Sequence, residues 1–477
     1  MVIVNRNRQL IITAFIAAAM ITVVFSALVP AAFDGDTEDD IVLGAGSAVA
    51  MLAGGSTHTL ALKDDGTVWA WGYNDYGQLG DGTNTQRNNP VQVRVDAGTF
   101  LTGVISVAAG STHSLALKSD GTVWAWGYNN YGSLGIGTSG GAANKNYAVQ
   151  VKADADTFLT GVTSIAAGSY HSLALRENDN KTNVLAWGYN FYGQLGDGST
   201  TNRPYPVQVK NELAMVIEGM KAIWAGGDSS FAMKNDGTLS AWGNNSSGQL
   251  GIGSSGNTRS NPAAVNVLTD VKIISSGSSF TVALKDDGTA WAWGGNGFGQ
   301  LGDGTYTGCT SPQQVKGAGG VGSLIDVIDI RAGNSHATAL KNDGTVWAWG
   351  RGDGGQLGNN GIISSTSPQQ VKGGASGTEN LSGVISIASC AGSFSLALKG
   401  DGKVFAWGWN TNGQLGDGTS GAGTNKSTPV NTIFDDGTPL ILISGPSGIS
   451  TTVIIAIVAV AAIAAVGVGV YFFVLKK

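Results

Sequence analysis

One short pattern, a Trp-Gly pair followed closely by Gly-Gln-Leu-Gly or Gly-Ser-Leu-Gly, recurs seven times along this chain of 477 residues. The tryptophans of the seven pairs, at intervals of 55, 61, 55, 51, 56 and 58 residues, are Trp71, Trp126, Trp187, Trp242, Trp293, Trp349 and Trp407. A period of about 50 to 60 residues with several strands per copy is typical of a propeller or an array, and closed propellers carry about four to eight blades. The repeat therefore predicts an all-β fold, a seven-bladed β-propeller of four-stranded blades.

Each copy of the repeat contains four strand-like segments. In the second copy these are residues 104–108, 113–118, 122–127 and 148–152. Asp120-Gly121, between the second and third segments, predicts a β-hairpin with a type I′ turn. Corresponding first segments at 48–53 and 383–388, and last segments at 90–95 and 429–433, make the copies complete within residues 48–434. Residues 440–443 are a spare segment, a candidate strand for closing the ring.

The alternation of side chains within a segment explains how the copies stack. Trp124 and Trp126 point to one face of their strand, and the small Ala125 points to the other. A bulky face of one blade packs against the small face of the next, so a closed ring buries the tryptophans. We therefore expect these tryptophans to form the core rather than to stack on a ligand.

Both ends of the chain carry long uncharged segments. Residues 10–29 follow two arginines and precede an acidic run, which predicts a signal peptide or an N-terminal membrane anchor over 1–33 and an acidic linker over 34–47. After a linker at 435–451, residues 452–475 carry no charge and suit a transmembrane helix, and residues 476–477 are a lysine pair.

Basic residues mark the cytoplasmic side of a membrane segment. Because they flank the outer ends of both segments, the propeller is expected to face outward from the cell membrane. The protein is then single-pass, or two-pass if the N-terminal segment is not cleaved.

Composition and motifs exclude several classes of function. The net charge is −6 and no basic stripe is present, so we expect no nucleic acid partner. Cys309 and Cys390 lack the spacing of a metal site, and the glycine-rich turns lack the Walker spacing of a phosphate loop. Four histidines at one repeat position (His58, His113, His171 and His336) fit a packing or hydrogen-bonding role better than a metal. We therefore expect no catalytic residues, no cofactor and no metal.

The recurring pattern AGxxHSLALKxDGTVWAWGxNxxGQLGxGT…PxxV resembles the repeat of the regulator of chromosome condensation family. The resemblance covers about residues 48–433 and implies a seven-bladed propeller. It also implies a choice of functions, because members include a guanine-nucleotide exchange factor for the Ran GTPase, secreted β-lactamase-inhibitor propellers and proteins that bind other partners. The chain lacks the exchange factor's basic tail, and its one enlarged hairpin, at 176–184, is short.

The loops after each Gly-Gln-Leu-Gly differ between copies, as recognition loops on one rim of a propeller do. They cover residues 83–89, 138–147, 199–205, 254–261, 305–311, 360–367 and 419–428. Arginine and tyrosine are favoured at interface hot spots. The candidate partner-binding rim residues are Arg87, Lys145, Tyr147, Arg203, Tyr205, Arg259 and Tyr306. The leading hypothesis is a monomeric, membrane-anchored, non-catalytic propeller that binds a protein or glycan through this rim; the alternative is a regulatory protein with nucleotide-exchange activity.

Overall fold

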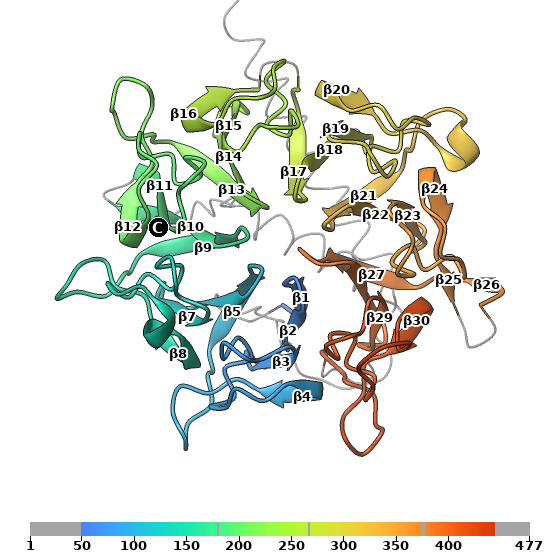
Figure 1. Ribbon diagram of the computed structural model, residues 1–477, viewed down its shortest axis with the longest axis horizontal. Coiled ribbons are helices and arrows are strands. Elements are labelled where there is room, and N and C mark those ends of the chain that lie inside the picture. The colour runs from blue at the N-terminus through green and yellow to red at the C-terminus, as the bar shows by residue number, and fades with distance from the viewer. Residues whose placement is uncertain (1–48, 179–180, 266–267, 374–376, 444–477) are drawn as a thin grey trace, which may run out of the picture. The chain divides into compact units, whose positions relative to one another are not determined.

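Seven four-stranded antiparallel sheets surround a central channel in the computed structural model, which describes residues 49–178, 181–265, 268–373 and 377–443 (Figure 1). Each sheet is one blade, and its four strands are consecutive in the chain. The first strand of a blade lies nearest the channel and the fourth lies outermost (Figure 1). The predicted all-β, seven-bladed propeller is confirmed.

The blades are numbered here in chain order. Blade 1 holds β1 (Met51–Gly54), β2 (His58–Leu62), β3 (Val68–Gly72) and β4 (Arg87–Gln92). Blade 2 holds β5 (Val104–Ala109), β6 (His113–Lys118), β7 (Val123–Gly127) and β8 (Lys145–Gln150), with a short 3-10 helix, η1 (Gly141–Ala143), before β8. Blade 3 holds β9 (Val162–Ala167), β10 (His171–Asn178), β11 (Lys181–Gly188) and β12 (Arg203–Gln208).

The remaining blades repeat this order. Blade 4 holds β13 (Met220–Gly226), β14 (Ser229–Lys234), β15 (Leu239–Gly243) and β16 (Arg259–Ala264). Blade 5 holds β17 (Val271–Ser276), β18 (Phe280–Lys285), β19 (Ala290–Gly294) and β20 (Cys309–Gln314), followed by η2 (Ala318–Gly320). Blade 6 holds β21 (Val327–Ala332), β22 (His336–Lys341), β23 (Val346–Gly350) and β24 (Ser365–Gln370). A ribbon of β25 (Lys372–Gly373) and β26 (Glu379–Asn380) precedes blade 7, which holds β27 (Val384–Ser389), β28 (Phe394–Lys399), β29 (Val404–Gly408) and β30 (Lys426–Asn431).

The fourth strands for which bounds were predicted, in blades 1, 2 and 7, begin earlier than predicted. In blade 2 it covers Lys145–Gln150 rather than residues 148–152, and in blade 1 it covers Arg87–Gln92 rather than 90–95. Its first residues are polar, and backbone pairing with the end of the third strand continues past a register shift. An outermost strand is covered on few sides, so it tolerates polar residues that a search for apolar residues passes over.

The Asp-Gly hairpin is not the predicted type I′ turn. In blade 2, Gly121 has a φ of 77°, but Asp120 is not among the residues with positive φ. The N–H of Gly121 donates to the Lys118 carbonyl at 3.0 Å, as in a type I turn that ends in a left-handed glycine. The Asp120 carboxylate accepts bonds from the Thr122 N–H and hydroxyl, at 3.0 and 2.6 Å, and these bonds favour this turn.

The tryptophan of each Trp-Gly pair is fully buried between two blades. Trp126 of blade 2 packs in a cluster with Leu60 and Ala70 of blade 1, and its Nε1–H donates to the Gln78 carbonyl at 2.9 Å. Trp71 makes the same bond to the Gln414 carbonyl and so joins blade 1 to blade 7. The predicted core role is confirmed for the tryptophans of the Trp-Gly pairs, whereas the tryptophan two residues earlier, such as Trp124, is only half-buried.

The repeated histidines connect neighbouring blades. His113 Nε2 lies 3.0 Å from the hydroxyl of Ser172 in the next blade, and that hydroxyl donates to the Ser133 carbonyl. His58, His171 and His336 make the same contact to a serine of the next blade. Burial lowers the pKa of His113 to about 4, so the ring is neutral at pH 7. The predicted hydrogen-bonding role is therefore confirmed.

The spare segment at residues 440–443 closes the ring without forming a separate strand. Ile441 bridges to Lys403 of blade 7, and the Leu442 carbonyl accepts the N–H of Asp64 in blade 1 at 3.0 Å. Between blades 1 and 2 the linker residue Gly103 accepts the N–H of Ser119 at 3.0 Å in the same way. The segment thus occupies the place of an interblade linker.

Within the described residues, no helix is long and apolar enough to cross a membrane. The predicted signal or anchor at 1–33, the acidic linker at 34–47 and the transmembrane segment at 452–475 all lie outside those residues.

Candidate functional site

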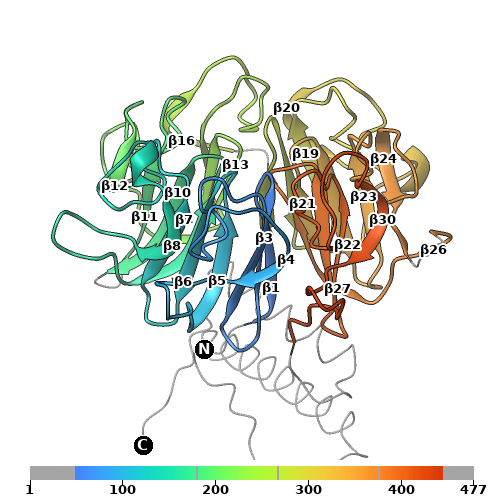
Figure 2. The ribbon, with the colours of Figure 1, turned by 60° about the horizontal axis from the view of Figure 1, so that its bottom comes forward.

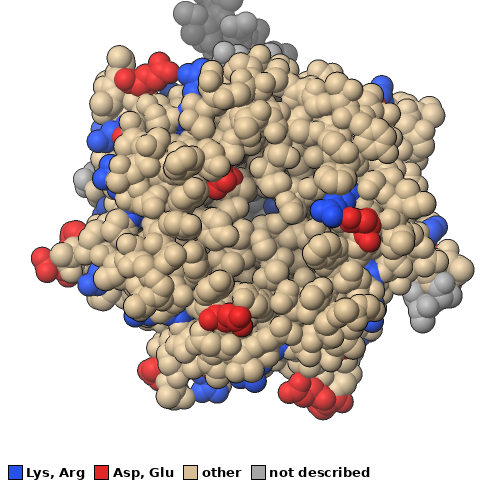
Figure 3. All heavy atoms as spheres, in the orientation of Figure 1, with Lys and Arg blue, Asp and Glu red and all other residues tan. Residues whose placement is uncertain are grey.

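Two loops of every blade meet on the same side of the propeller. These are the loop between the first and second strands and the loop between the third and fourth; in blade 2 the Tyr128 N–H joins them by donating to the Thr112 carbonyl at 3.0 Å. We call this side the loop face. It is the upper side in Figure 2 and faces the viewer in Figure 3, where Lys, Arg, Asp and Glu are sparse except toward the periphery.

Most of the predicted rim residues do not lie in loops. Because the fourth strands begin early, all but one are strand residues at the outer edge of the loop face, and only Tyr306 lies in a connecting loop, where it is 59% exposed. The rim residues that the structure places on fourth strands are Arg87, Lys145, Tyr147, Arg203, Tyr205 and Arg259. The seven are spread over five blades, so they do not form one compact site.

Several of these side chains are already engaged within the scaffold. Arg87 pairs with Asp81 at 2.8 Å, and Arg203 pairs in the same way with Asp197. Burial of Asp81 opposes its ionisation, but bonds from the Thr83 hydroxyl and N–H and from Arg87 outweigh this and lower the pKa of the carboxyl. The two arginines therefore hold the turn that precedes their strand.

The two rim tyrosines also stabilise the contact between blades. Tyr147 lies over Gly82 of the preceding blade, so closely that a Cβ on that glycine would come within 2.6 Å of the ring. Tyr205 covers Gly137 in the same way. Lys145 and Arg259 follow turns in which isoleucine replaces the aspartate, and Arg259 instead approaches Glu212 at 3.7 Å.

A continuous group of aromatic rings lies elsewhere on the loop face, across blades 1 to 3. Each ring contacts at least one other at a centroid distance between 4.6 and 6.4 Å. Phe191 is 64% exposed and the others are half-buried, so they present ring surface to solvent. We call this group the tyrosine cluster: Tyr73, Tyr76, Tyr128, Tyr131, Tyr170, Tyr189, Phe191 and Tyr192.

The repeat geometry explains why these rings meet. The first residue after a Trp-Gly pair contacts the fourth residue after the pair in the preceding blade. Tyr128 thus lies 4.9 Å from Tyr76, and Tyr189 lies 4.6 Å from Tyr131, between ring centroids. Tyrosine fills both positions in copies one to three only. This difference between copies is visible in the sequence, and it is the signal that points to the cluster.

A half-buried carboxylate, Asp228 of blade 4, lies at the end of the tyrosine cluster. Asp228 occupies the same repeat position as Tyr170 of blade 3. Gln194 Nε2–H donates to its Oδ1 at 3.2 Å, and within the described part of the chain it forms no ion pair. Burial raises the pKa of Asp228 to about 6. A half-buried acid with a raised pKa and no ion-pair partner, at the end of a group of aromatic side chains, marks a candidate functional site.

The other half of the loop face, over blades 5 to 7, also carries aromatic side chains, and there a cation lies over two of them, Phe298 and Trp409, which remain 41% and 39% exposed. The Arg351 guanidinium lies 5.0 Å from the ring centroid of Phe298 and 5.9 Å from that of Trp409. It also donates two hydrogen bonds to Asp353, at 2.8 and 2.7 Å. Aromatic rings, cation and carboxylate are therefore all present in this half.

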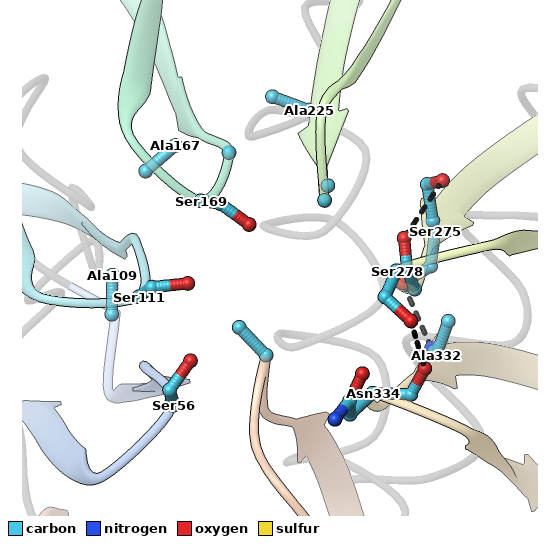
Figure 4. A pocket seen from close by; sticks show the side chains of 17 residues that line it. Ser56, Ala109, Ser111, Ala167, Ser169, Ala225, Ser275, Ser278, Ala332 and Asn334 are labelled. Carbon is cyan, nitrogen blue, oxygen red and sulfur yellow. Dashed lines mark hydrogen bonds between the residues drawn. The ribbon is translucent and has the colours of Figure 1, made fainter. Parts of the chain in front are cut away.

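The central channel opens between the two halves. Its cavity of about 230 Å³ is lined by glycine, alanine, serine and asparagine, and Ser56, Ser111 and Ser169 lie around it (Figure 4). Backbone bonds connect the lining loops: the Ser56 N–H donates to the Ser111 carbonyl at 3.2 Å, and the Ser111 N–H to the Ser169 carbonyl at 3.0 Å. The described residues that line this cavity carry no charge. Among the described residues, no three His, Cys, Asp or Glu side chains gather where they could hold a metal.

The fold and the repeated interblade bonds define a class of protein, the RCC1-type β-propeller. The RCC1-like domain matches residues 30–327, and the regulator of chromosome condensation (RCC1) repeat matches residues 343–398 and 401–453. The chain belongs to this family, as its repeat pattern predicted.

Three relatives illustrate the range of proteins that share the propeller. The ultraviolet-B receptor UVR8 of Arabidopsis thaliana is 31% identical over 379 residues, 78% of this chain and 79% of the receptor. The RCC1 domain-containing protein RUG3, mitochondrial, of the same plant is 30% identical over 77% of this chain and 82% of its own. The human E3 ubiquitin-protein ligase HERC2 is 31% identical over 82% of this chain, but the chain spans only 8% of that ligase.

Solved structures show the same fold. Yeast RCC1 (Prp20), solved bound to Kap60, has a TM-score of 0.64 and 22% identity, and the match covers 85% of this chain and 90% of that one. Human WBSCR16 has a TM-score of 0.59 and 24% identity over 72% of this chain and 85% of its own. At these identities the likeness concerns the fold alone.

Proposed function

We propose that the protein is a non-catalytic, membrane-anchored propeller that binds a protein or glycan partner through its loop face. The observation that carries the proposal is the tyrosine cluster. Tyrosine offers a large contact surface with few rotatable bonds, and it is enriched at interface hot spots. Eight aromatic rings, seven of them tyrosines, on a face with few charges offer an interaction surface that a scaffold role alone does not require.

The membrane part of the proposal rests on the sequence of the two ends. The uncharged segments at 10–29 and 452–475, with basic residues on their outer flanks, favour a single-pass or two-pass protein whose propeller faces outward. Nucleotide exchange on a cytosolic GTPase, the alternative that the family suggests, needs the propeller inside. Protease treatment of intact cells separates the two: an outward propeller is cleaved, and a protected one favours exchange.

Crosslinking on matched positions tests the binding face. Phe191 in the cluster and Phe158 in the linker between blades 2 and 3 are 64% and 52% exposed, so each accepts p-azidophenylalanine without loss of core packing. In the full chain on cells, we expect illumination to join a defined partner to position 191, and much less to 158. Replacing Tyr131 and Tyr189 by Ala should remove that product. Equal products from both positions, or a product that persists without the two tyrosines, would contradict the proposal.

A further inference from the structure

We propose that Tyr170, Tyr189 and Asp228 form a binding site for an arginine side chain of a partner protein. The inference rests on the proposed function, since it names the chemistry of the partner at the end of the tyrosine cluster. It is carried by a comparison inside the chain, because the other half of the loop face holds such an arginine of its own.

The arrangement around Arg351 shows which group completes a set of aromatic rings and a carboxylate on this scaffold. The guanidinium lies over Phe298 and Trp409 and is bound at two nitrogens by Asp353. A planar guanidinium stacks on aromatic faces and pairs with a carboxylate through two parallel bonds, and a lysine ammonium does neither as well. Arginine is therefore the cation that the geometry of the loop face favours.

The repeat position of Arg351 is the residue after the Trp-Gly pair, which in blade 4 is Asn244. Asn244 is too short to cover a neighbouring ring, and its Oδ1 accepts the Ser246 N–H at 2.9 Å. The Asn244 N–H donates to the Asp228 backbone carbonyl at 2.9 Å, so the two residues are neighbours. Blade 4 thus has no cation at this position. Its carboxylate, Asp228, comes from the loop between the first and second strands, whereas Asp353 of blade 6 comes from the loop between the third and fourth.

The charges around Asp228 agree with an open cation site. The loops that carry Tyr170 and Asp228 are adjacent, because the Ser169 N–H donates to the Gly227 carbonyl at 2.7 Å, and the Gln194 amide donates to the Asp228 carboxylate at 3.2 Å. Tyr170 and Tyr189 of blade 3 interact electrostatically with Asp228, and within the described residues no Lys or Arg forms an ion pair with it. Burial and then neighbouring groups, Asp228 among them, raise the pKa of Tyr170 and Tyr189, so both hydroxyls stay protonated at pH 7. A half-buried carboxylate without a cationic partner destabilises the free protein, and a guanidinium would relieve that cost.

An isosteric pair of probes tests the site on the full chain, purified in detergent with 3-fluorotyrosine in place of tyrosine. Nα-acetyl-arginine methylamide carries the guanidinium, and Nα-acetyl-citrulline methylamide has the same shape without the charge. We expect the arginine probe to shift the fluorine signals of Tyr170 and Tyr189 saturably in the millimolar range, and about fivefold more tightly than the citrulline probe. Signals are assigned with single Tyr→Phe variants.

Two carboxylate variants complete the test. Asp228→Asn should remove the preference for arginine, so that the two probes bind within about twofold of each other. Asp75→Asn is the matched control, since Asp75 is an exposed acid on the same face that accepts a bond from Tyr73 at 2.7 Å; it should leave the preference intact. Equal binding of the probes to the unaltered chain, no saturable shift, or a preference that survives Asp228→Asn would overturn the inference.

The outcome is separable from that of the proposed function. If crosslinking at position 191 depends on the tyrosines but the probes bind equally, the cluster binds its partner without an arginine, and only the inference fails. If crosslinking does not depend on the tyrosines, the proposed function fails whatever the probes do.

Discussion

Both halves of the loop face are built on the same scaffold of blades. They differ in whether the carboxylate near their aromatic rings is paired with a cation. Over blades 5 to 7, Arg351 covers two aromatic rings and neutralises Asp353. Over blades 1 to 4, the tyrosine cluster has Asp228 at one end, and this carboxylate has no ion-pair partner among the described residues. This difference shows how a binding site can arise in a repeat protein. The backbone presents equivalent positions in every blade, and a few substitutions decide which of them are left open for a partner.

The largest predicted effect tests whether the buried tryptophans contribute equally to stability under the two halves of the loop face. Trp242 and Trp349 are fully buried, and each donates its Nε1–H to a glutamine carbonyl at 2.9 Å. Trp242→Ala and Trp349→Ala should each lower the free energy of unfolding by about 3 to 5 kcal/mol. Denaturant titration followed by tryptophan fluorescence measures both. If only one of the two variants lost stability, the buried scaffold would differ between the two halves of the loop face.

The second prediction concerns the two acids, which should respond in opposite ways. Burial raises the pKa of Asp228 to about 6, above its ordinary 3.8, so its ionisation destabilises the fold above pH 6 and that cost disappears below about pH 4. Asp228→Asn should therefore raise the free energy of unfolding at pH 7.5 by up to about 3 kcal/mol, and by little at pH 4.

Asp353 should show the reverse sign. The bond from Arg351 outweighs burial and lowers the pKa of Asp353, so the stability from this pair is present above pH 4 and is lost as pH falls. Because this carboxylate is half exposed, Asp353→Asn should cost less than about 1 kcal/mol at pH 7.5. Denaturant titrations measure both variants. If Asp228→Asn and Asp353→Asn changed the free energy of unfolding in the same direction, the proposed difference between the two halves would be wrong.

The third prediction converts the open half into the covered one. Asn244→Arg places an arginine at the repeat position of Arg351, beside Asp228. The built-in guanidinium should compete with the arginine probe and weaken its binding about tenfold, which corresponds to about 1.4 kcal/mol. Asn244→Gln adds length without charge and is the control. Unchanged probe binding to the arginine variant would place the site elsewhere.

The smallest predicted effect is the reverse conversion. Arg351→Ala uncovers Phe298 and Trp409 beside Asp353, so the arginine probe should bind there weakly, with a dissociation constant on the order of 10 mM or more. The fluorine signal of 5-fluorotryptophan at position 409 reports it, since Trp409 is 39% exposed. Arg351→Lys keeps the cation and should not gain this response. An Arg351→Ala signal indifferent to the probe would mean that rings and a carboxylate alone do not make such a site.

The fold was predictable because its determinants recur seven times. Each Trp-Gly pair marks the third strand of a blade, and alternation along Val123–Gly127 places the bulky Trp126 and the small Ala125 on opposite faces, both of which are buried against neighbouring blades. The fourth strands and the Asp120-Gly121 turn were less predictable. An outermost strand needs few apolar residues, and the turn type depends on whether one or two residues adopt positive φ, which Asp-Gly allows either way.

The candidate site was only partly predictable. Residue type suggested Arg87 and Arg203, but their pairing with Asp81 and Asp197 is decided by the path of the preceding turn. Tyrosines at fixed positions in three copies are visible in the sequence, whereas contacts between adjacent blades appear only once the ring closes. Asp228 lacks a cationic partner because of the side chains that surround it in the fold. The spacing of residues in the sequence does not show which side chains these are.

The proposed arginine-binding site is tested most directly by measuring the pKa of the Asp228 carboxyl with and without the arginine probe. Carbon-13 NMR of the full chain labelled at aspartate, with Asp228→Asn for assignment, gives both values. We expect a pKa near 6 for Asp228 in the free protein and a fall of about one unit or more at saturating probe, because a bound guanidinium favours the ionised carboxylate. The citrulline probe should leave the pKa unchanged. A pKa of Asp228 near 4 in the free protein, or a pKa that the arginine probe does not lower, would contradict an arginine-binding site at this carboxylate.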